Sequence, residues 1–363
     1  MPIYMDVHYV PGLKAYDAAE AHQKDLTIQQ QHHCKCMTYW VDEPRGVVFC
    51  LIDAPDKETV EEMHKNSHGL IPHKILEVNN SIVESFLGRI HDPDDASIGE
   101  NGLKVFSDSA YRVLLVARHA DYVLLKHRMG VVAAERLLGS ERDLLRQEGL
   151  KHGGRMIEHS PDASVLPFPS AAAAVACALD IRLSVAESGA AGMRMSLTGG
   201  DPVAVSDRLF GDALALGIQL CQLKDGERIA MSATVKELLP RDLCRLHGDE
   251  LSILSSKDEA LMISLIGILE KHGQEAEFGV EAFCRKAALS KSQLYRKTLE
   301  LWNLAPNPLL RRYRLEKALA LMRKKTCSIA GITFESGFTS PSYFTKCFKE
   351  TFGLLPAAYM QMV

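Results

Sequence analysis

The pattern of hydrophobic and polar positions divides this chain into three periodic regions separated by two polar breaks. Residues 91–102 (HDPDDASIGENG) and residues 271–279 (KHGQEAEFG) are rich in Pro, Gly or charged side chains, which interrupt helices and strands. A chain of 363 residues also exceeds what one hydrophobic core usually organises. We therefore expect a linker at the first break and three domains, at residues 1–90, 103–269 and 274–363.

The first region combines strand-like and helix-like patterns. Apolar residues at alternate positions predict strands, and apolar residues three or four apart predict helices. The predicted strands cover residues 3–9, 37–42, 47–53 and 82–87. The predicted helices cover residues 15–31 and 56–66. The resulting order, βαββαβ, predicts a ferredoxin-like α/β sandwich in which two helices cover one face of an antiparallel sheet.

The middle region mixes apolar strands with helices rich in Ala and Leu. Strands are predicted in YRVLLVA, GGRMIEH and SVLPF, and helices near residues 130–147 and in SAAAAVACALDIRLSV. This mixture indicates an α/β or α+β domain. After residue 279 every periodic segment is helical. The whole chain is therefore predicted to be a multidomain α+β protein with an all-α C-terminal domain.

Composition narrows the setting of the protein. With 47% hydrophobic and 24% charged residues and no long apolar run, the sequence indicates a soluble globular chain without membrane spans. No targeting segment is recognisable, so we expect a cytoplasmic location. The nine cysteines are scattered except for Cys34 and Cys36, and we expect reduced thiols. Because the net charge is -4, nucleic-acid binding would require a local basic surface.

Residues 278–299 predict two short helices joined by a tight turn. Phe283 and Cys284 mark the apolar face of the first helix, and Ser290 can cap the second. Leu294 and Leu299 face inward in this second helix. The polar side chains left facing outward can reach phosphates and base edges, and they are Lys291, Ser292, Gln293, Arg296 and Lys297.

A second pair of short helices is predicted in SIAGITFESGFTSPSYFTKCFKETFG. Gly337 supplies the turn, Ser340 can cap the next helix, and Pro341 suits its first position, where no amide hydrogen is needed. Three phenylalanines recur every four residues and must point to the core. The side chains left to contact DNA are Ser340, Ser342, Tyr343, Thr345, Lys346 and Lys349.

The last ninety or so residues resemble the DNA-binding domain of the AraC/XylS family. The resemblance rests on Gly337-Phe338, Ser340, Ser342-Tyr343-Phe344, Phe348-Lys349, Phe352-Gly353, Pro356 and Tyr359. It implies two helix-turn-helix units, held by a connecting helix near residues 308–324, that insert their second helices into successive major-groove segments of operator DNA. The alternative is a helical bundle whose basic residues form a solvated face. One departure is Met360, where the family often has a basic residue.

The middle region contains GGRMIEHSPDASVLPFPSAAAAVACALDI, RMSLTGG and a helix beginning LFGDALALGIQL. With these segments, residues 109–240 are similar in order to a class III nucleotidyl cyclase domain. That family needs two aspartates that bind two Mg²⁺ ions. Asp162 falls where the second belongs, whereas Arg118 replaces the first. Ala215 and Gln219 stand where the family places an Asn and an Arg that contact ribose and phosphate. We therefore expect no catalytic residues and no enzyme activity, and a role as a dimerising or coupling module.

The first region is rich in metal-ligand side chains. MDVH, AEAHQKDL, YWVDEPRGVVFCLIDAP and VEEMHKNSHGLIPHKILEV resemble a family of small nickel-binding proteins with a ferredoxin-like fold. His64 and His68 lie one turn apart on one helix face, and Asp6 and His8 share a strand face. The expected metal ligands are His8, His22, Cys50, His64 and His68. Imidazole and thiolate suit a transition metal, with Ni²⁺ favoured and Zn²⁺ or Cu as alternatives.

Several alternatives stay open at this point. The histidines and thiols could instead be ordinary surface and core residues. HHCKC, residues 32–36, could be a second metal site, a redox pair or a helix end. The leading hypothesis is a metal-responsive, homodimeric transcriptional regulator that binds double-stranded operator DNA, with RNA polymerase as a further candidate partner. The alternatives are an enzyme that makes or hydrolyses a cyclic nucleotide, and an N-terminal metal store or small-molecule binder.

Overall fold

The N-terminal domain contains the predicted βαββαβ order. The computed structural model describes residues 1–94, 96–98, 102–119, 121–160, 162–188, 192–224, 228–240, 242–243, 247–325 and 327–363. The elements of this domain are β1 (Ile3–Tyr9), α1 (Ala15–Ile28), β2 (Lys35–Asp42), β3 (Val47–Asp53), α2 (Lys57–Ser67) and β4 (Lys74–Val78). The sheet order is β2-β3-β1-β4 with antiparallel pairing throughout, which is the arrangement of a ferredoxin-like sandwich.

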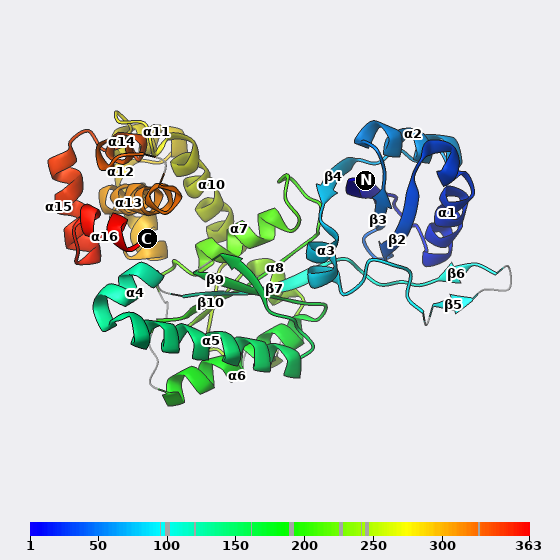
Figure 1. Ribbon diagram of the computed structural model, residues 1–363, viewed down its shortest axis with the longest axis horizontal. Coiled ribbons are helices and arrows are strands. Elements are labelled where there is room, and N and C mark those ends of the chain that lie inside the picture. Colours follow the sequence, from blue (N-terminus) through cyan, green and yellow to red (C-terminus); the bar gives the residue numbers. More distant parts are fainter. Residues whose placement is uncertain are drawn as a thin grey trace.

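Both faces of this sheet are covered, and each by different elements. Side chains of alternate strand residues point to opposite faces. On one face, Tyr4 and Ile52 pack with Val60 and Met63 of α2. On the other face, a larger set of apolar side chains packs with α3 (Asn80–Leu87) and with the middle domain. In Figure 1, α1 and α2 accordingly lie on the outer side of the sheet and α3 lies toward the middle domain.

The strand predicted at residues 82–87 is wrong, because this segment forms helix α3. The carbonyl of the Asn79 side chain accepts a hydrogen bond from the amide of Ser81 (2.9 Å), and Gly88 ends the helix with φ +85°. Val83, Phe86 and Leu87 are buried at helical spacing. The fourth strand is β4, directly before the cap. The β-branched start of the segment suggested a strand, but the cap and the spacing favour a helix.

The segment predicted as a linker is partly structured. Strands β5 (Ser97–Ile98) and β6 (Lys104–Val105) pair as a short antiparallel hairpin that lies against the N-terminal domain (Figure 1). Residues 95 and 99–101 of this segment lie outside the described part. Just after β6, the ring of Phe106 stacks on Tyr39 with 4.1 Å between ring centroids. The segment therefore packs against the first domain before it enters the second.

The middle domain is built on a six-stranded mixed sheet of order β12-β11-β10-β7-β9-β8. Its strands are β7 (Arg112–Arg118), β8 (Ile157–Ser160), β9 (Ala163–Phe168), β10 (Arg194–Gly200), β11 (Ile229–Met231) and β12 (Leu251–Ile253). Its helices are α4 (Tyr122–Met129), α5 (Val131–Lys151), α6 (Ala171–Ser188), α7 (Gly211–Leu220) and α8 (Ala233–Glu237). Apolar side chains of α5 and α6 pack on one face of the sheet, and those of α7 pack on the other (Figure 1).

The C-terminal part is helical, as predicted. Its helices are α10 (Ser256–His272), α11 (Val280–Ala287), α12 (Lys291–Trp302), α13 (Pro306–Lys324), α14 (Ile329–Glu335), α15 (Pro341–Phe352) and α16 (Pro356–Met362). The pairs α11–α12 and α14–α15 form the two helix-turn-helix units, and α13 connects them (Figure 1). The guanidinium of Arg314 on α13 donates hydrogen bonds to the carbonyls of Gly273, Glu275 and Phe278 (2.8–2.9 Å), which fixes the loop before α11.

The middle domain is docked on the second helix-turn-helix unit through α4. Val123 and Leu124 are buried together with apolar residues of α13, α15 and α16. Asp121, the N-cap of α4, accepts hydrogen bonds from Arg323 and from the hydroxyl of Tyr359 (3.0 Å). Within the described residues, no helix is both long and apolar enough to cross a membrane.

Candidate DNA-binding surface and metal centre

The first helix-turn-helix unit exposes one face of α12. Ser290 caps this helix in a capping box, because its hydroxyl accepts from the amide of Gln293 (3.2 Å) and the Gln293 side chain accepts from the Ser290 amide (2.9 Å). Leu294 is fully buried beneath them. Four of the predicted DNA-contacting side chains are exposed, namely Lys291, Ser292, Gln293 and Arg296.

The charged residues of α12 differ in how strongly they are held. Lys291 pairs with Glu281 across the turn (2.9 Å), and both side chains are largely exposed. Lys297 is only 23% exposed, and its ammonium contacts Asp258 of α10 (3.1 Å) and Glu300 (2.8 Å). Lys297 would have to leave these carboxylates to reach a phosphate. The exposed Lys291 can do so at little cost, since exposed ion pairs contribute little.

The second unit exposes the corresponding face of α15. Ser340 accepts a hydrogen bond from the amide of Tyr343 (3.3 Å) and caps the helix, and Pro341 occupies its first turn. Phe344 and Phe348 are fully buried, as predicted, and they orient the helix on its core. The exposed residues of the predicted set are Ser342, Tyr343, Lys346 and Lys349, with Thr345 and Ser340 half-buried. Two polar recognition surfaces therefore flank the connecting helix.

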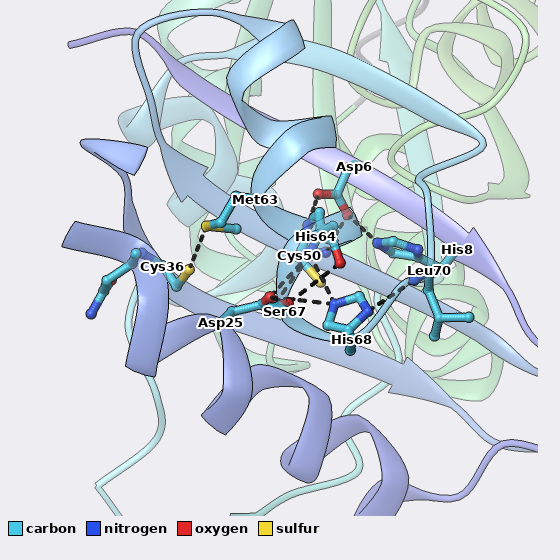
Figure 2. A network of polar contacts seen from close by, with 11 residues as sticks. Asp6, His8, Asp25, Cys36, Cys50, Met63, His64, Ser67, His68 and Leu70 are labelled. Carbon is cyan, nitrogen blue, oxygen red and sulfur yellow. Dashed lines mark hydrogen bonds and ion pairs between the residues drawn. The ribbon is translucent and has the colours of Figure 1, made fainter. Parts of the chain in front are cut away.

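Most of the predicted metal ligands come together between the sheet of the N-terminal domain and its helices. Asp6, His8, Cys50 and His64 are buried, and one ligand atom from each lies within 4.8 Å of the others. Asp6 and His8 come from β1, Cys50 from β3 and His64 from α2, as Figure 2 shows. The Asp6 carboxylate is the centre of the group, at 2.9 Å from Nε2 of His64 and 3.3 Å from Nε2 of His8.

A second group shares His64 with the first. Asp25 from α1 lies 3.3 Å from Nδ1 of His64 and 3.3 Å from Nε2 of His68. The Ser67 hydroxyl donates to the same carboxylate. The two imidazoles meet directly, with 3.0 Å between Nδ1 of His64 and Nε2 of His68. His64 therefore bridges two buried carboxylates (Figure 2).

The electrostatics of this cluster favour a bound cation. Burial would raise the pKa of Asp6, but His64 and His8 hold it well below its usual range. Burial would likewise lower the pKa of His64, but Asp6 and Asp25 raise it to about 10. Burial, Asp6 and Asp25 together raise the pKa of the Cys50 thiol well above its ordinary value. A protonated His64 thus balances the carboxylates, which is the role that a metal cation could take over.

Two observations support the fit of a metal ion to these residues. Among the described residues, Nδ1 of the buried His8 has no hydrogen-bond partner, although unsatisfied buried polar groups are costly, whereas its Nε2 faces the Asp6 carboxylate at 3.3 Å. A cavity of about 20 Å³ lies between the helices and the sheet, and its wall includes His8, Asp25, Cys50 and His68. This is room for about one water-sized occupant. Imidazole, thiol and carboxylate together form a donor set suited to a transition metal.

The structure assembles most of the predicted ligand set and adds two carboxylates. His22 borders the same cavity, but its Nε2 lies 3.8 Å from Asp92 and it belongs to neither ligand group. In the prediction, Asp6 shares the strand face of His8 but lies outside the expected ligand set, and Asp25 is not named. Asp25 follows His22 by three residues on the buried face of α1. In the sequence, an acidic residue on an otherwise apolar helix face was the signal that could have identified it.

The HHCKC segment forms a helix end followed by a strand. His33 adopts φ +53° after a short 3₁₀ turn, and β2 begins at Lys35. Burial raises the pKa of the Cys34 thiol to about 11 and the pKa of the Cys36 thiol further. The Cys36 sulfur lies 3.7 Å from the sulfur of Met63 in the core. Because reactive thiols need a lowered pKa, these two cysteines have a structural environment.

In the middle domain, the residues compared with cyclase aspartates lie side by side. Arg118 ends β7, and its guanidinium is 3.8 Å from the carboxylate of Asp162, which precedes β9. Asp162 also lies 3.6 Å from the guanidinium of Arg323 on α13. Two arginines therefore lie beside Asp162. A Mg²⁺ site would need a second carboxylate at this place.

Comparisons with known proteins identify the two end domains. Residues 4–78 match the family model described as nickel responsive protein SCO4226-like, and residues 283–362 match the helix-turn-helix domain model. The chain carries an N-terminal SCO4226-like domain and a C-terminal AraC-type helix-turn-helix domain, as the sequence predicted. The relatives include the transcriptional activators RhaS and RhaR.

Individual relatives match only part of the chain. The transcriptional activator RhaS of Escherichia fergusonii is 31% identical over 39% of this chain and 51% of its own length. Histidine kinase P4 of Formosa agariphila is 33% identical over 29% of this chain and 8% of its own length. The crystal structure of SCO4226 from Streptomyces coelicolor has 30% identity over 21% of this chain and 94% of that chain, with a TM-score of 0.20. The chain thus spans about half the length of RhaS and a small part of histidine kinase P4.

Proposed function

We propose that this chain is a transcriptional regulator that binds operator DNA through α12 and α15 and responds to a transition metal held by its N-terminal domain. One observation carries the metal part of the proposal. The buried group of Asp6, His8, Cys50 and His64 is preformed in the same chain as an AraC-type domain. A buried cluster in which Nδ1 of His8 lacks a hydrogen-bond partner has no evident packing role, but it suits a sensor that binds an ion.

The residues proposed to hold the ion are His8, Cys50 and His64, with Asp6 beside them and His68 as the outer member. When bound, the metal would supply the positive charge that His64 otherwise provides to the carboxylates. Nickel is favoured because the matching family is described as nickel-responsive, while Zn²⁺ and Cu²⁺ share the same donor preferences.

For the middle domain we propose a role as a degenerate cyclase-like module that couples the two ends and supports a homodimer. Arg118 beside Asp162 opposes the binding of Mg²⁺, so catalysis is not part of the proposal. The shared core supports the coupling role, because Phe86 of α3 stacks on Phe210 of the middle domain at 4.9 Å. Contact with RNA polymerase would follow from activation at a promoter.

The test combines metal titration with DNA binding by the full chain. A binding site is first selected from random double-stranded DNA, and its affinity is then measured with and without Ni²⁺, Zn²⁺ and Cu²⁺. We expect stoichiometric binding of one of these metals and a five- to 150-fold change in DNA affinity, which is typical of such coupling, at roughly 1–3 kcal/mol. The double variant His64→Ala, His68→Ala should lose both effects.

The variant His127→Ala is the matched control, because His127 is exposed on α4 and lies outside both ligand groups. Absence of stoichiometric metal binding, or binding unaffected by the double variant, would disprove the metal site. Metal binding that leaves DNA affinity unchanged would disprove the sensor role and leave a metal store. Absence of DNA binding by the folded chain at low salt would contradict the regulator itself.

A further inference from the structure

A pocket of about 270 Å³ lies at the seam between the middle domain and the C-terminal helices. Residues of β7, α7, α10, α12 and α13 line it, so it exists only where the two parts of the chain meet. Neither the metal cluster nor the recognition surfaces include any of its residues. The connecting helix α13 forms one wall, and this helix carries both helix-turn-helix units.

The charges in this pocket are not mutually satisfied. Its wall carries four cationic side chains, Arg118, Arg312, Lys317 and Arg323, against three carboxylates, Asp162, Glu270 and Glu316. The pairs Arg118–Asp162, Arg323–Asp162 and Arg312–Glu316 are separated by 3.8, 3.6 and 3.9 Å. These separations exceed the 2.7–3.2 Å of a typical N–H···O hydrogen bond. Arg323 also donates to Asp121, and Arg312 contacts the side-chain oxygen of Gln222 at 3.5 Å, but guanidinium donors of Arg118 and Arg312 remain for another acceptor.

The cationic side chains also repel one another in a partly dry setting. Burial lowers the pKa of Arg312, and the nearby Arg194 and Arg118 lower it further, against the opposing effect of Glu316. The Arg312 side chain is 28% exposed and that of Arg118 is 26% exposed. An anion placed between them would relieve this repulsion, and guanidinium groups bind carboxylate and phosphate oxygens in a bidentate manner.

Most of the uncharged side chains in the pocket wall are apolar. Ile218, Ile266, Leu269, Trp302 and Leu309 contribute to it. A ligand that fits both parts therefore carries one anionic group and a compact apolar body. The volume is just below the roughly 300–1,000 Å³ of common ligand sites, which favours a small organic anion over a nucleoside triphosphate.

We propose that this pocket binds a small organic anion, a carboxylate or phosphate monoester with an apolar body, between Arg118 of the middle domain and Arg312 of α13. Such a ligand contacts both sides of the seam. The pocket is then a second effector site, independent of the metal cluster. The two residues act as binding residues, and Gln219 stands beside them as a further polar donor, while the Gln222 amide donates to Glu316 (3.1 Å).

The experiment measures binding of defined probes to the metal-free full chain in phosphate-free buffer. Benzoate and phenyl phosphate are compared with benzamide, a neutral molecule of similar shape, by calorimetry and thermal melting. We expect at least one anion to bind and to raise the melting temperature, and benzamide to bind at least tenfold more weakly. Arg312→Gln should weaken anion binding at least tenfold, whereas Arg146→Gln on the exposed face of α5 should not.

A second variant keeps the proposal testable if Arg312→Gln fails to fold. Ile266→Trp fills the pocket without changing its charge and should also abolish binding of the anions. The double variant His64→Ala, His68→Ala should bind them normally, which separates this site from the metal site. The proposal is overturned if neither anion binds, if benzamide binds equally well, or if both pocket variants retain wild-type affinity.

Discussion

At the scale of single residues, the metal cluster shows how a small domain holds several ionisable groups in its interior. Asp6 and Asp25 are nearly inaccessible, and both contact the imidazole of His64 on α2. An unpaired buried carboxylate would cost several kcal/mol, so the histidines stabilise the fold as well as forming a site. The sequence indicated His8, Cys50 and His64 because their residue types suit a metal. It could not show the convergence, which depends on the packing of α1 and α2 over the sheet.

Metal binding should release protons and strengthen with pH. At neutral pH, His64 is protonated because its pKa is raised to about 10, and Cys50 is a neutral thiol because burial and the nearby Asp6 and Asp25 raise its pKa well above its ordinary value. A metal needs both groups deprotonated, so each released proton should raise the apparent affinity about tenfold per pH unit. Calorimetry in buffers of different ionisation enthalpy measures the proton count. Cys50→Ser should reduce it by one, and a pH-independent affinity would contradict the assignment.

The side chain of Gln293 has two roles that one substitution can separate. It completes the capping box of α12, and it is exposed on the recognition surface. Gln293→Glu retains the box, since glutamate serves equally at this position. We expect unchanged thermal stability, and weaker binding to the selected DNA site by about 1–3 kcal/mol if the amide contacts a base. Equal losses on selected and unrelated DNA would indicate only phosphate repulsion.

Lys346 on α15 is the corresponding test of the second unit. It is 70% exposed, and its ion pair with Glu350 at 3.9 Å is loose, so this pair opposes its contact with DNA only weakly. Lys346→Ala should reduce the affinity for the selected site by about 1–3 kcal/mol if the ammonium contacts a base edge. If it contacts only phosphate, the loss should be uniform across sequences and the salt dependence should decrease. Binding measured at several salt concentrations on both kinds of DNA distinguishes these outcomes, and unchanged affinity on both would exclude Lys346 from the interface.

At the scale of elements, long periodic segments and strong caps were predictable and short ambiguous ones were not. The strands at residues 3–9 and 47–53 and the capped helices α12 and α15 agree with their predicted positions. The segment of residues 82–87 begins with β-branched residues, which favour a strand, but its buried residues have helical spacing. The cap at Asn79 and the end at Gly88 favour the helix. The fourth strand lies in β4, whose five residues are too short for a clear alternating pattern.

The cap of α3 should contribute measurably to stability. Asn79 accepts the hydrogen bond of the Ser81 amide, which no other residue of the helix can satisfy. Asn79→Ala should lower the free energy of unfolding by about 1 kcal/mol, and α3 should exchange its amide hydrogens faster. Ser81→Ala is the control, because its exposed side chain takes no part in the cap, and it should change stability by less than about 0.5 kcal/mol. Equal effects of both variants would contradict the capping role.

At the scale of the whole molecule, apolar and polar contacts link three parts that the sequence separates by polar breaks. The N-terminal sheet shares one core with α3 and α7, while α4 packs on the second helix-turn-helix unit. Within the part of the chain that the structure describes, these contacts connect the metal-binding domain to the DNA-binding end through the middle domain. Sequence patterns could place each domain but could not reveal these interfaces, because they form between segments more than a hundred residues apart.

The seam at Asp121 should control how firmly the DNA-binding end is docked. This buried carboxylate accepts hydrogen bonds from Arg323 and Tyr359, and its removal leaves both donors without their acceptor. Asp121→Ala should cost about 1–3 kcal/mol, more than Tyr359→Phe at about 0.5–1.5 kcal/mol, because hydrogen bonds to a charged group are stronger. Hydrogen exchange should accelerate specifically in residues 122–129 and 356–362, where α4 and α16 meet. Arg146→Gln, an exposed change on α5, should leave those rates unchanged. Unaltered exchange in both helices of Asp121→Ala would show that apolar packing of Val123 and Leu124 alone holds the two parts together.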